Sequence, residues 1–208
     1  MSQIQEMLYE PFRHWADRKS LYFFSDPHFG DEDVKLMDKD WISPSEQVER
    51  INNAVPKNAT LVFLGDIGNP DYIMRIKAEH KVLILGNHDK ASIRKFFDET
   101  YNGPLWISQK ILLSHEPIEG LTCCLNIHGH DHGGVLRKDE YHLNLAANIC
   151  GYTPMSIKDI LSSGYLSRID DIHRIAIDRQ KENSLKKKEE KKTSWDDMQL
   201  FWDDCFVE

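Results

Sequence analysis

The sequence lacks the features of several protein classes. Its 208 residues include only four cysteines, and none of them shows the CxxC spacing that is typical of zinc sites or redox motifs. No apolar run approaches the roughly 18 residues that a membrane-spanning helix needs. Residues 1–10 show no basic start followed by an apolar stretch, so we expect no secretory signal. Together these absences predict a cytoplasmic protein with no disulfide framework and no membrane partner.

Positive charge is also in short supply. The chain has 26 Lys and Arg residues against 34 Asp and Glu residues, which gives a net charge of −8. A protein that wraps duplex DNA through bulk electrostatics needs the opposite balance, so we expect no tight binding to duplex DNA. A nucleotide or another small phosphate ester stays compatible with an acidic chain, because a metal ion can supply positive charge locally.

Three short apolar runs in the first half of the sequence predict buried strands. They cover residues 21–25, 60–64 and 81–85, and each ends abruptly in a polar turn. A helix is expected to begin after Ser43, which is a suitable N-cap, and Glu46 is expected to complete a capping box. Further helices are predicted over residues 71–78 and 90–97. The alternation of strand and helix predicts an α/β domain.

The second half of the sequence shows strand patterns with few helices between them. Short apolar runs predict strands around residue 107 and over residues 111–114, 123–127 and 140–145. Strands that follow one another without crossover helices favour an antiparallel or mixed sheet. A short helix is expected to begin at Ser156 and to end near Gly164. The fold class predicted for the whole chain is therefore α/β (α+β), with mixed β structure flanked by helices.

The composition changes near the C-terminal end. We expect one main domain over residues 1–178, because residues 181–192 contain six lysines and three glutamates. This charge run predicts a solvated linker or helix over residues 179–194. Residues 195–208 carry aromatic side chains at helical spacing among acidic residues, which predicts an amphipathic tail. Such a tail could dock on its own domain, mediate a homo-oligomer or bind in a partner's groove.

Polar side chains follow five of the predicted strands in an ordered series. The series consists of Asp26, His28, Asp66, Asn87, His88, Asp89, His115, His128, His130 and His132. Because strand ends gather at one edge of an α/β sheet, these side chains are expected to converge. Asp and Asn are also common in ordinary turns, but each residue of this set stands directly after a predicted strand. Carboxylate, amide and imidazole groups suit Mn, Fe, Zn or Ni, and the number of groups favours two ions that share a carboxylate.

The ordered series resembles the motifs of the calcineurin-like metallophosphoesterase superfamily. The matching motifs are Asp26-x-His28, Gly65-Asp66, Gly86-Asn87-His88-Asp89, His115 and Gly129-His130-x-His132. The match runs in order from about residue 21 to about residue 160, and residues 25–30 resemble the small bacterial and phage members. The resemblance implies the calcineurin-like phosphoesterase fold, a two-sheet mixed β sandwich flanked by helices, with residues 1–178 as the catalytic domain.

The resemblance also implies the role of each residue in the site. Asp26, His28 and His132 would hold one divalent ion, and Asn87, His115 and His130 would hold the other. Asp66 would bridge the two ions, for which Mn²⁺ is favoured over Fe, Zn or Ni. His88 would face the phosphate as a catalytic residue, and Asp89 would orient His88. The sequence departs from many small relatives at Asp31, where they have a histidine.

The function implied is the hydrolysis of phosphate esters by attack of a metal-bridging hydroxide. We expect phosphodiesters to be favoured over monoesters, because the chain leaves little room for a separate substrate-recognition domain. The alternative is a catalytically weak metal-binding scaffold of the same fold that acts in protein interaction. Such members tend to lose the histidine that corresponds to His88, which this sequence retains.

The remaining histidines are expected to be structural. His128 stands next to the last motif, and we expect it to support the site without binding an ion. His14, His80, His142 and His173 are expected on the surface or in the core with ordinary partners, and Asp171-x-His173 is interpreted as a chance match.

Overall fold

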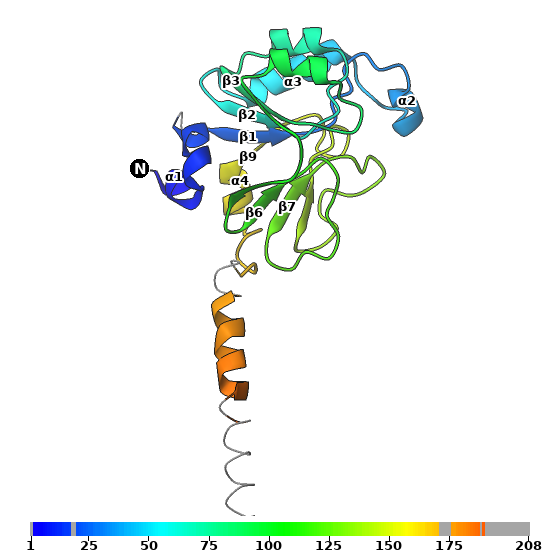
Figure 1. The fold of residues 1–208 in the computed structure, drawn as a ribbon. Helices are drawn as coiled ribbons and strands as arrows, with labels where there is room; N and C mark the ends of the chain where they lie inside the picture. The colour runs from blue at the N-terminus through cyan, green and yellow to red at the C-terminus, as the bar shows by residue number, and fades with distance from the viewer. Residues whose placement is uncertain (1, 18–19, 171–175, 188, 190–208) are drawn as a thin grey trace, which may run out of the picture. The chain divides into compact units, whose positions relative to one another are not determined.

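The computed structural model describes residues 2–17, 20–170, 176–187 and 189. The chain divides into two compact units, Met1–Ile169 and Asp170–Glu208. All strands of the described residues lie in the first unit, where they form two sheets (Figure 1). The chain is thus a mixed α/β protein, in agreement with the predicted fold class.

The first sheet contains five strands, in the order β4-β3-β2-β1-β9. β1 (Leu21–Phe24), β2 (Thr60–Phe63), β3 (His80–Ile84) and β4 (Glu99–Tyr101) are parallel, whereas β9 (Met155–Ser156) is antiparallel to β1. The three apolar runs of the first half therefore form strands as predicted, within one residue at their ends. β4 and β9 were not predicted, because both are short and β4 begins with polar residues.

The second sheet contains four strands, in the order β5-β6-β7-β8. They are β5 (Leu105–Ser108), β6 (Ile111–Leu113), β7 (Leu125–His128) and β8 (His142–Asn144). β5 pairs with β6 in antiparallel fashion, and the other two pairs are parallel. The sheet is therefore mixed, which is one of the two arrangements predicted.

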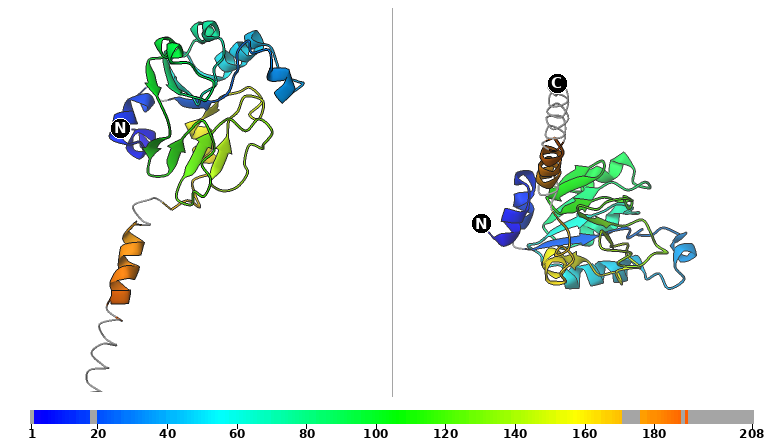
Figure 2. Two further views of the ribbon diagram at one scale, coloured as in Figure 1. Left: turned by 45° about the vertical axis from the view of Figure 1, so that its right-hand side comes forward. Right: turned by 90° about the horizontal axis from the view of Figure 1, so that it is seen from below.

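Alternating side chains of the first sheet enter two different hydrophobic clusters. Phe23 and Val62 belong to a cluster that also contains Leu113 and Ile127 of the second sheet. The intervening Phe24, Leu61 and Phe63 lie in the other cluster, together with Val48 and Ile51 of the long helix. This period of two is expected for strands buried on both faces. One cluster joins the two sheets and the other joins the first sheet to its helices, and Figure 2 shows these layers from two further directions.

The longest helix of the first unit is α3 (Pro44–Ala54), and it begins as predicted. The Ser43 hydroxyl accepts a hydrogen bond from the Glu46 N–H at 3.3 Å. The predicted capping box is only half formed, because the Glu46 carboxylate pairs with Arg50 at 2.8 Å. An i,i+4 partner of opposite charge competes successfully for this carboxylate.

The other helices of the first unit are short. They are α1 (Gln3–Met7), η1 (Glu10–Ala16), α2 (Val34–Met37), η2 (Pro70–Arg75), η3 (Ala91–Phe96) and α4 (Ile157–Ser162). The helices predicted over residues 71–78 and 90–97 are present as the 3₁₀ helices η2 and η3, which have six residues each. α4 begins as predicted, with the Ser156 hydroxyl accepting from the Asp159 N–H at 3.1 Å.

The second unit has a helix over residues 176–187, which includes part of the predicted charged linker or helix. The compact first unit ends at Ile169, earlier than the predicted boundary at residue 178. Ile169 is 1% exposed and is the last residue of the core cluster, which explains the earlier boundary. Residues 195–208, predicted as the amphipathic tail, lie outside the described residues. The described helices include none with the length and apolar character of a membrane span.

Candidate metal centre

The predicted site residues come together at the carboxyl ends of parallel strands from both sheets. They lie in the segments that directly follow β1, β2 and β3 of the first sheet and β6 and β7 of the second. These side chains include two groups of three. Within each group, the possible ligand atoms all lie within 4.8 Å of one another. The groups are Asp26, His28 and His132, and Asp66, His115 and His130. Each group could hold a metal ion.

The first group contains buried polar atoms that lack a hydrogen bond. Asp26 Oδ1 and His28 Nε2 have no hydrogen-bond partner among the described residues, although Asp26 is fully buried and His28 is 2% exposed. His132 completes the group, with its Nε2 at 3.7 Å from Asp26 Oδ1. An unpaired buried polar atom costs free energy, so its presence needs an explanation. A cation coordinated by all three atoms would satisfy them.

The second group brings several electron-pair donors close to one nitrogen. His115 Nδ1 lies 2.8 Å from the Leu64 carbonyl, to which it donates, so that the Nε2 of the neutral ring carries a lone pair. This Nε2 lies 2.7 Å from Asn87 Oδ1 and 3.2 Å from His130 Nδ1. Asn87 is also a predicted ligand. It is not a member of the group formed by Asp66, His115 and His130, but its side chain contacts His115 of that group. A proton on His115 Nε2 can satisfy these atoms in the metal-free protein, and a metal ion could take its place among them.

Asp66, a member of the second group, also lies close to the first group. Its Oδ2 is 3.7 Å from His28 Nε2 of the first group and 3.4 Å from His115 Nε2 of the second. Its Oδ1 accepts a hydrogen bond from the His88 backbone N–H at 2.9 Å, which fixes the orientation of the carboxylate. This position is compatible with the bridging role that the resemblance implies.

Two residues that the sequence reasoning missed orient the imidazoles of the first group. Asp31 Oδ2 lies 3.3 Å from His28 Nδ1, and Asn148 Oδ1 lies 3.0 Å from His132 Nδ1. Each oxygen accepts the Nδ1–H and leaves Nε2 free to face the group, an arrangement typical of metal-binding histidines. The spacing of Asp31, three residues after His28, was a usable signal. Asn148 is brought near His132 only by the fold.

The backbone of the site adopts uncommon conformations. Asp26, His28, Asp66 and His130 have φ values of 53°, 41°, 51° and 66°. Positive φ is rare outside glycine and costs on the order of 1–3 kcal/mol per residue. Gly129 packs against the same turn so closely that an added Cβ would overlap the side chains of Asp26 and Ser25. Such strain collects at functional sites when the surrounding structure holds the residues in place.

The electrostatics differ between the two groups of side chains. Burial lowers the pKa of His28 and raises the pKa of Asp26. Burial also opposes the charge of His115, but its hydrogen bond to Asp66 and the nearby carboxylates raise its pKa to about 9. The pKa of Asp66 is lowered, since its contacts with His115 outweigh the effect of burial. The carboxylates therefore attract a cation, which is a proton on His115 when no metal ion is bound.

His88 occupies a different position from the candidate ligands. It is exposed, and its ring lies 5.9 Å from the ring of His28. It lines a cleft of about 410 Å³, together with Asp31 and Lys90. The cleft is also lined by the carboxylate of Asp89, so His88 and Lys90 are the groups there that could contact an anionic ligand.

Asp89 does not have the predicted contact with His88. Its two carboxylate oxygens accept hydrogen bonds from the backbone N–H groups of Asp66, Ile67 and Gly86 at 2.9–3.0 Å. None of the hydrogen bonds described for Asp89 reaches the His88 imidazole. Backbone amides compete well for a carboxylate at this position, because the turns after β2 and β3 present three of them together. Asp89 thus fixes the two turns that carry Asp66 and Asn87.

The other histidines near the site are structural in this arrangement. His128 is buried, and its Nδ1 lies 2.8 Å from the Gly129 carbonyl. His142 is also buried and contacts Asp139 at 2.9 Å. His173 lies outside the described residues.

Comparisons with known proteins give a fold and no activity. No family model and no curated protein matches the chain. One similar solved structure is the crystal structure of a protein of unknown function from Aquifex aeolicus, with a TM-score of 0.57 and 25% sequence identity. The match covers 69% of this chain and 98% of that chain. It supports a shared mixed α/β architecture.

Proposed function

We propose that the protein is a dinuclear-metal-dependent phosphoesterase and that its two sheets form the sandwich of the calcineurin-like fold. One observation carries the proposal. Asp26 Oδ1 and His28 Nε2 are buried with no hydrogen-bond partner in the described part of the chain, and Asp66 lies close to them and to a second set of converging donor atoms. Two carboxylates, one amide and four imidazoles at one sheet edge are a donor set that suits two borderline divalent ions. Mn²⁺ is the ion we favour.

The chain's own residues would have three tasks in the reaction. When bound, two divalent ions supply a hydroxide at neutral pH and neutralise charge on a transferring phosphoryl group. Asp26, Asp66, Asn87 and the four histidines of the two groups would hold the ions. His88 is exposed at the cleft and free of the candidate ligand groups, so it is placed to donate a proton to the leaving group or to stabilise its charge. Lys90 adds positive charge for an anionic substrate.

A small phosphodiester is the substrate class we favour. The cleft of about 410 Å³ opens at the surface of the first unit, where His88 and Lys90 are exposed. An open cleft accepts an ester with groups on both sides of the phosphorus. The net charge of −8 disfavours tight binding to duplex DNA.

The direct test is the release of nitrophenol from bis(4-nitrophenyl) phosphate by metal-free protein to which Mn²⁺ is added. We expect activity that depends on Mn²⁺ and that falls roughly 100- to 10,000-fold in His88→Ala, which is the usual effect of removing a general acid. Metal content, measured on the same samples, is expected to be unchanged in this variant. 4-Nitrophenyl phosphate, tested in parallel, measures the preference for diesters.

The test also separates the enzyme from the alternative scaffold. Two bound ions without turnover of any ester would contradict the proposed activity and favour a metal-binding protein that acts through interaction. Unchanged activity in His88→Ala would remove His88 from the mechanism.

A further inference from the structure

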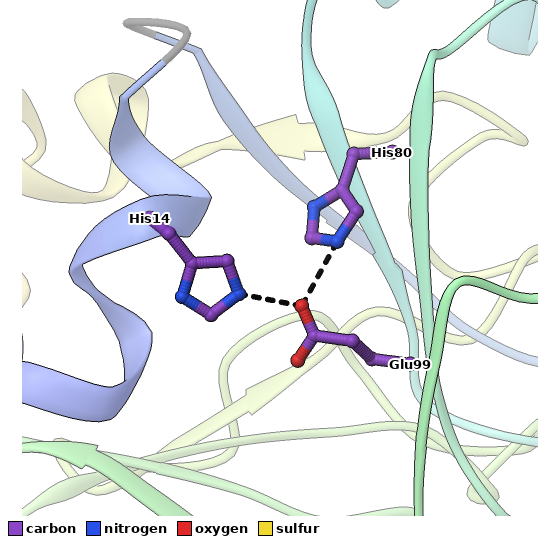
Figure 3. Close-up of side chains that lie close together, drawn as sticks. All are labelled: His14, His80 and Glu99. Atoms are coloured by element: carbon purple, nitrogen blue, oxygen red, sulfur yellow. Dashed lines mark hydrogen bonds and ion pairs between the residues drawn. The ribbon is translucent and has the colours of Figure 1, made fainter.

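We propose that His14, His80 and Glu99 bind an additional divalent metal ion, at a site separate from the candidate metal centre. The three side chains come from three elements, η1, β3 and β4, and point toward one another (Figure 3). Their ligand atoms lie within 4.8 Å of one another. The proposal does not depend on the proposed phosphoesterase function.

Both imidazoles approach the same carboxylate oxygen. His14 Nε2 lies 2.5 Å and His80 Nε2 lies 2.9 Å from Glu99 Oε1. The two rings are 5.7 Å apart between centroids and are tilted by 59°. In the metal-free protein the His14 contact is a hydrogen bond, and His80 lies at ion-pair distance from the same oxygen. When each imidazole carries its proton on Nδ1 instead, the same three atoms form a ligand set of two nitrogens and one oxygen.

The surrounding residues hold this ligand set in position. Glu99 Oε2 accepts a hydrogen bond from the Tyr101 hydroxyl at 2.7 Å, and Trp15 Nε1 lies 3.1 Å from Oε1. The Thr60 hydroxyl lies 3.1 Å from His80 Nδ1 and can accept a hydrogen bond from the Nδ1–H. This leaves His80 Nε2 as the ligand atom. The carboxylate and one imidazole are therefore oriented before an ion arrives.

The chemistry of the ligand set indicates which ions would bind. Two imidazoles and one carboxylate suit Zn²⁺, Ni²⁺, Co²⁺ or Fe²⁺ and not the oxygen-preferring Mg²⁺ or Ca²⁺. The side chain of His14 is 47% exposed, so water can fill the remaining coordination positions. Such an ion would fasten η1 to the edge of the first sheet, where β4 is the terminal strand. We therefore expect a structural role for this ion, which would stabilise the packing of the N-terminal segment against the first sheet.

The experiment counts Zn²⁺ ions in the full-length protein. Metal-free protein is titrated with Zn²⁺ by calorimetry at about one pH unit above 6.5, where imidazoles are ordinarily neutral. Two-bond ¹H–¹⁵N spectra of the same samples report which imidazole nitrogens change. We expect one equivalent of Zn²⁺ to shift the Nε2 signals of His14 and His80. In His14→Ala this binding should weaken at least about tenfold, since removing a residue that only orients a ligand already costs roughly 10- to 100-fold.

Two further variants keep the result unambiguous. His80→Gln removes the second imidazole and should lose the same equivalent, whereas Glu10→Ala removes an exposed carboxylate from the same helix and should behave like the wild type. The proposal is overturned if His14→Ala binds as many Zn²⁺ ions as the wild type with equal affinity. It is also overturned if Glu10→Ala loses the equivalent as well, because the binding would then belong to the acidic surface in general. Neither outcome bears on the phosphoesterase activity, which depends on other residues.

Discussion

At the scale of single residues, the candidate metal centre depends on hydrogen bonds to Nδ1 of three of its four imidazoles. His28, His115 and His132 each have Nδ1 next to an oxygen acceptor at 2.8–3.3 Å. These bonds fix both the orientation of the ring and the position of its proton. Affinity for metal is therefore expected to depend on residues that never touch an ion.

Asp31 provides a test of this dependence. Replacement by alanine removes the acceptor for His28 Nδ1–H, so Asp31→Ala is expected to weaken metal binding roughly 10- to 100-fold. Competition for Mn²⁺ with a chelator of known affinity measures the change. Asp31→Asn keeps an acceptor oxygen and should retain most of the affinity. Glu32→Ala, at the exposed neighbouring position, is the control and should bind as the wild type does.

Gly129 provides a second test at this scale. A Cβ at this position would overlap the side chains of Asp26 and Ser25, which cannot move away without disturbing the strained turn. We expect the Gly129→Ala variant to lose the metal ion held by Asp26, His28 and His132 and to have a lower melting temperature. Gly133 has nothing within 4 Å of a built Cβ, so Gly133→Ala is a matched control with little expected effect. Equal behaviour of the two variants would contradict the role of close packing at Gly129.

The sequence could predict the candidate ligands because their signal is local. Asp26, Asp66 and His115 each follow an apolar run, and the ends of such runs can be read without knowing the fold. The role of Asp89 could not be predicted, because its partners are backbone amides of two separate turns. Asn148 was missed for the same reason, since its contact with His132 depends on how the chain returns after β8.

At the scale of secondary-structure elements, burial decided which predictions were correct. β1, β2 and the last three residues of β3 are mostly buried apolar segments, and the sequence predicts these strands within one residue. β4 has intermediate burial throughout and contains Glu99 and Thr100, so its sequence carries no strand pattern. The helices around residues 71–78 and 90–97 were predicted at the correct places, but local periodicity does not distinguish a short 3₁₀ helix from a short α-helix.

The N-terminus of α3 offers a prediction about an element. Ser43→Ala removes the acceptor for the Glu46 N–H and is expected to lower the free energy of unfolding by about 1 kcal/mol. Ser43→Asp keeps an acceptor at the same place and should retain most of the stability. Urea denaturation followed by circular dichroism measures both changes. An equal loss in the two variants would show that the cap contributes through something other than this hydrogen bond.

At the scale of the whole molecule, the first unit contains the complete candidate metal centre and both sheets. Its core ends at Ile169, and the candidate ligands all lie between Asp26 and His132. The residues after this unit are therefore expected to be dispensable for folding and for metal binding.

Deletion of residues 193–208 tests this expectation. We expect the shortened protein to keep its melting temperature, its metal content and its activity toward bis(4-nitrophenyl) phosphate. Light scattering on both proteins measures the molar mass, which falls on deletion if the tail mediates a homo-oligomer. Loss of activity at unchanged molar mass would contradict the independence of the first unit.

The origin of the candidate ligands in two different sheets has a mechanical consequence. Asp26 and His28 follow β1 of one sheet, whereas His130 and His132 follow β7 of the other. An ion held by Asp26, His28 and His132 would act as a cross-link between the two layers, in addition to the hydrophobic cluster that they share. Separation of the layers would then require the ion to leave first. Amide hydrogen exchange in β1 and β7 should accordingly slow together when Mn²⁺ is added.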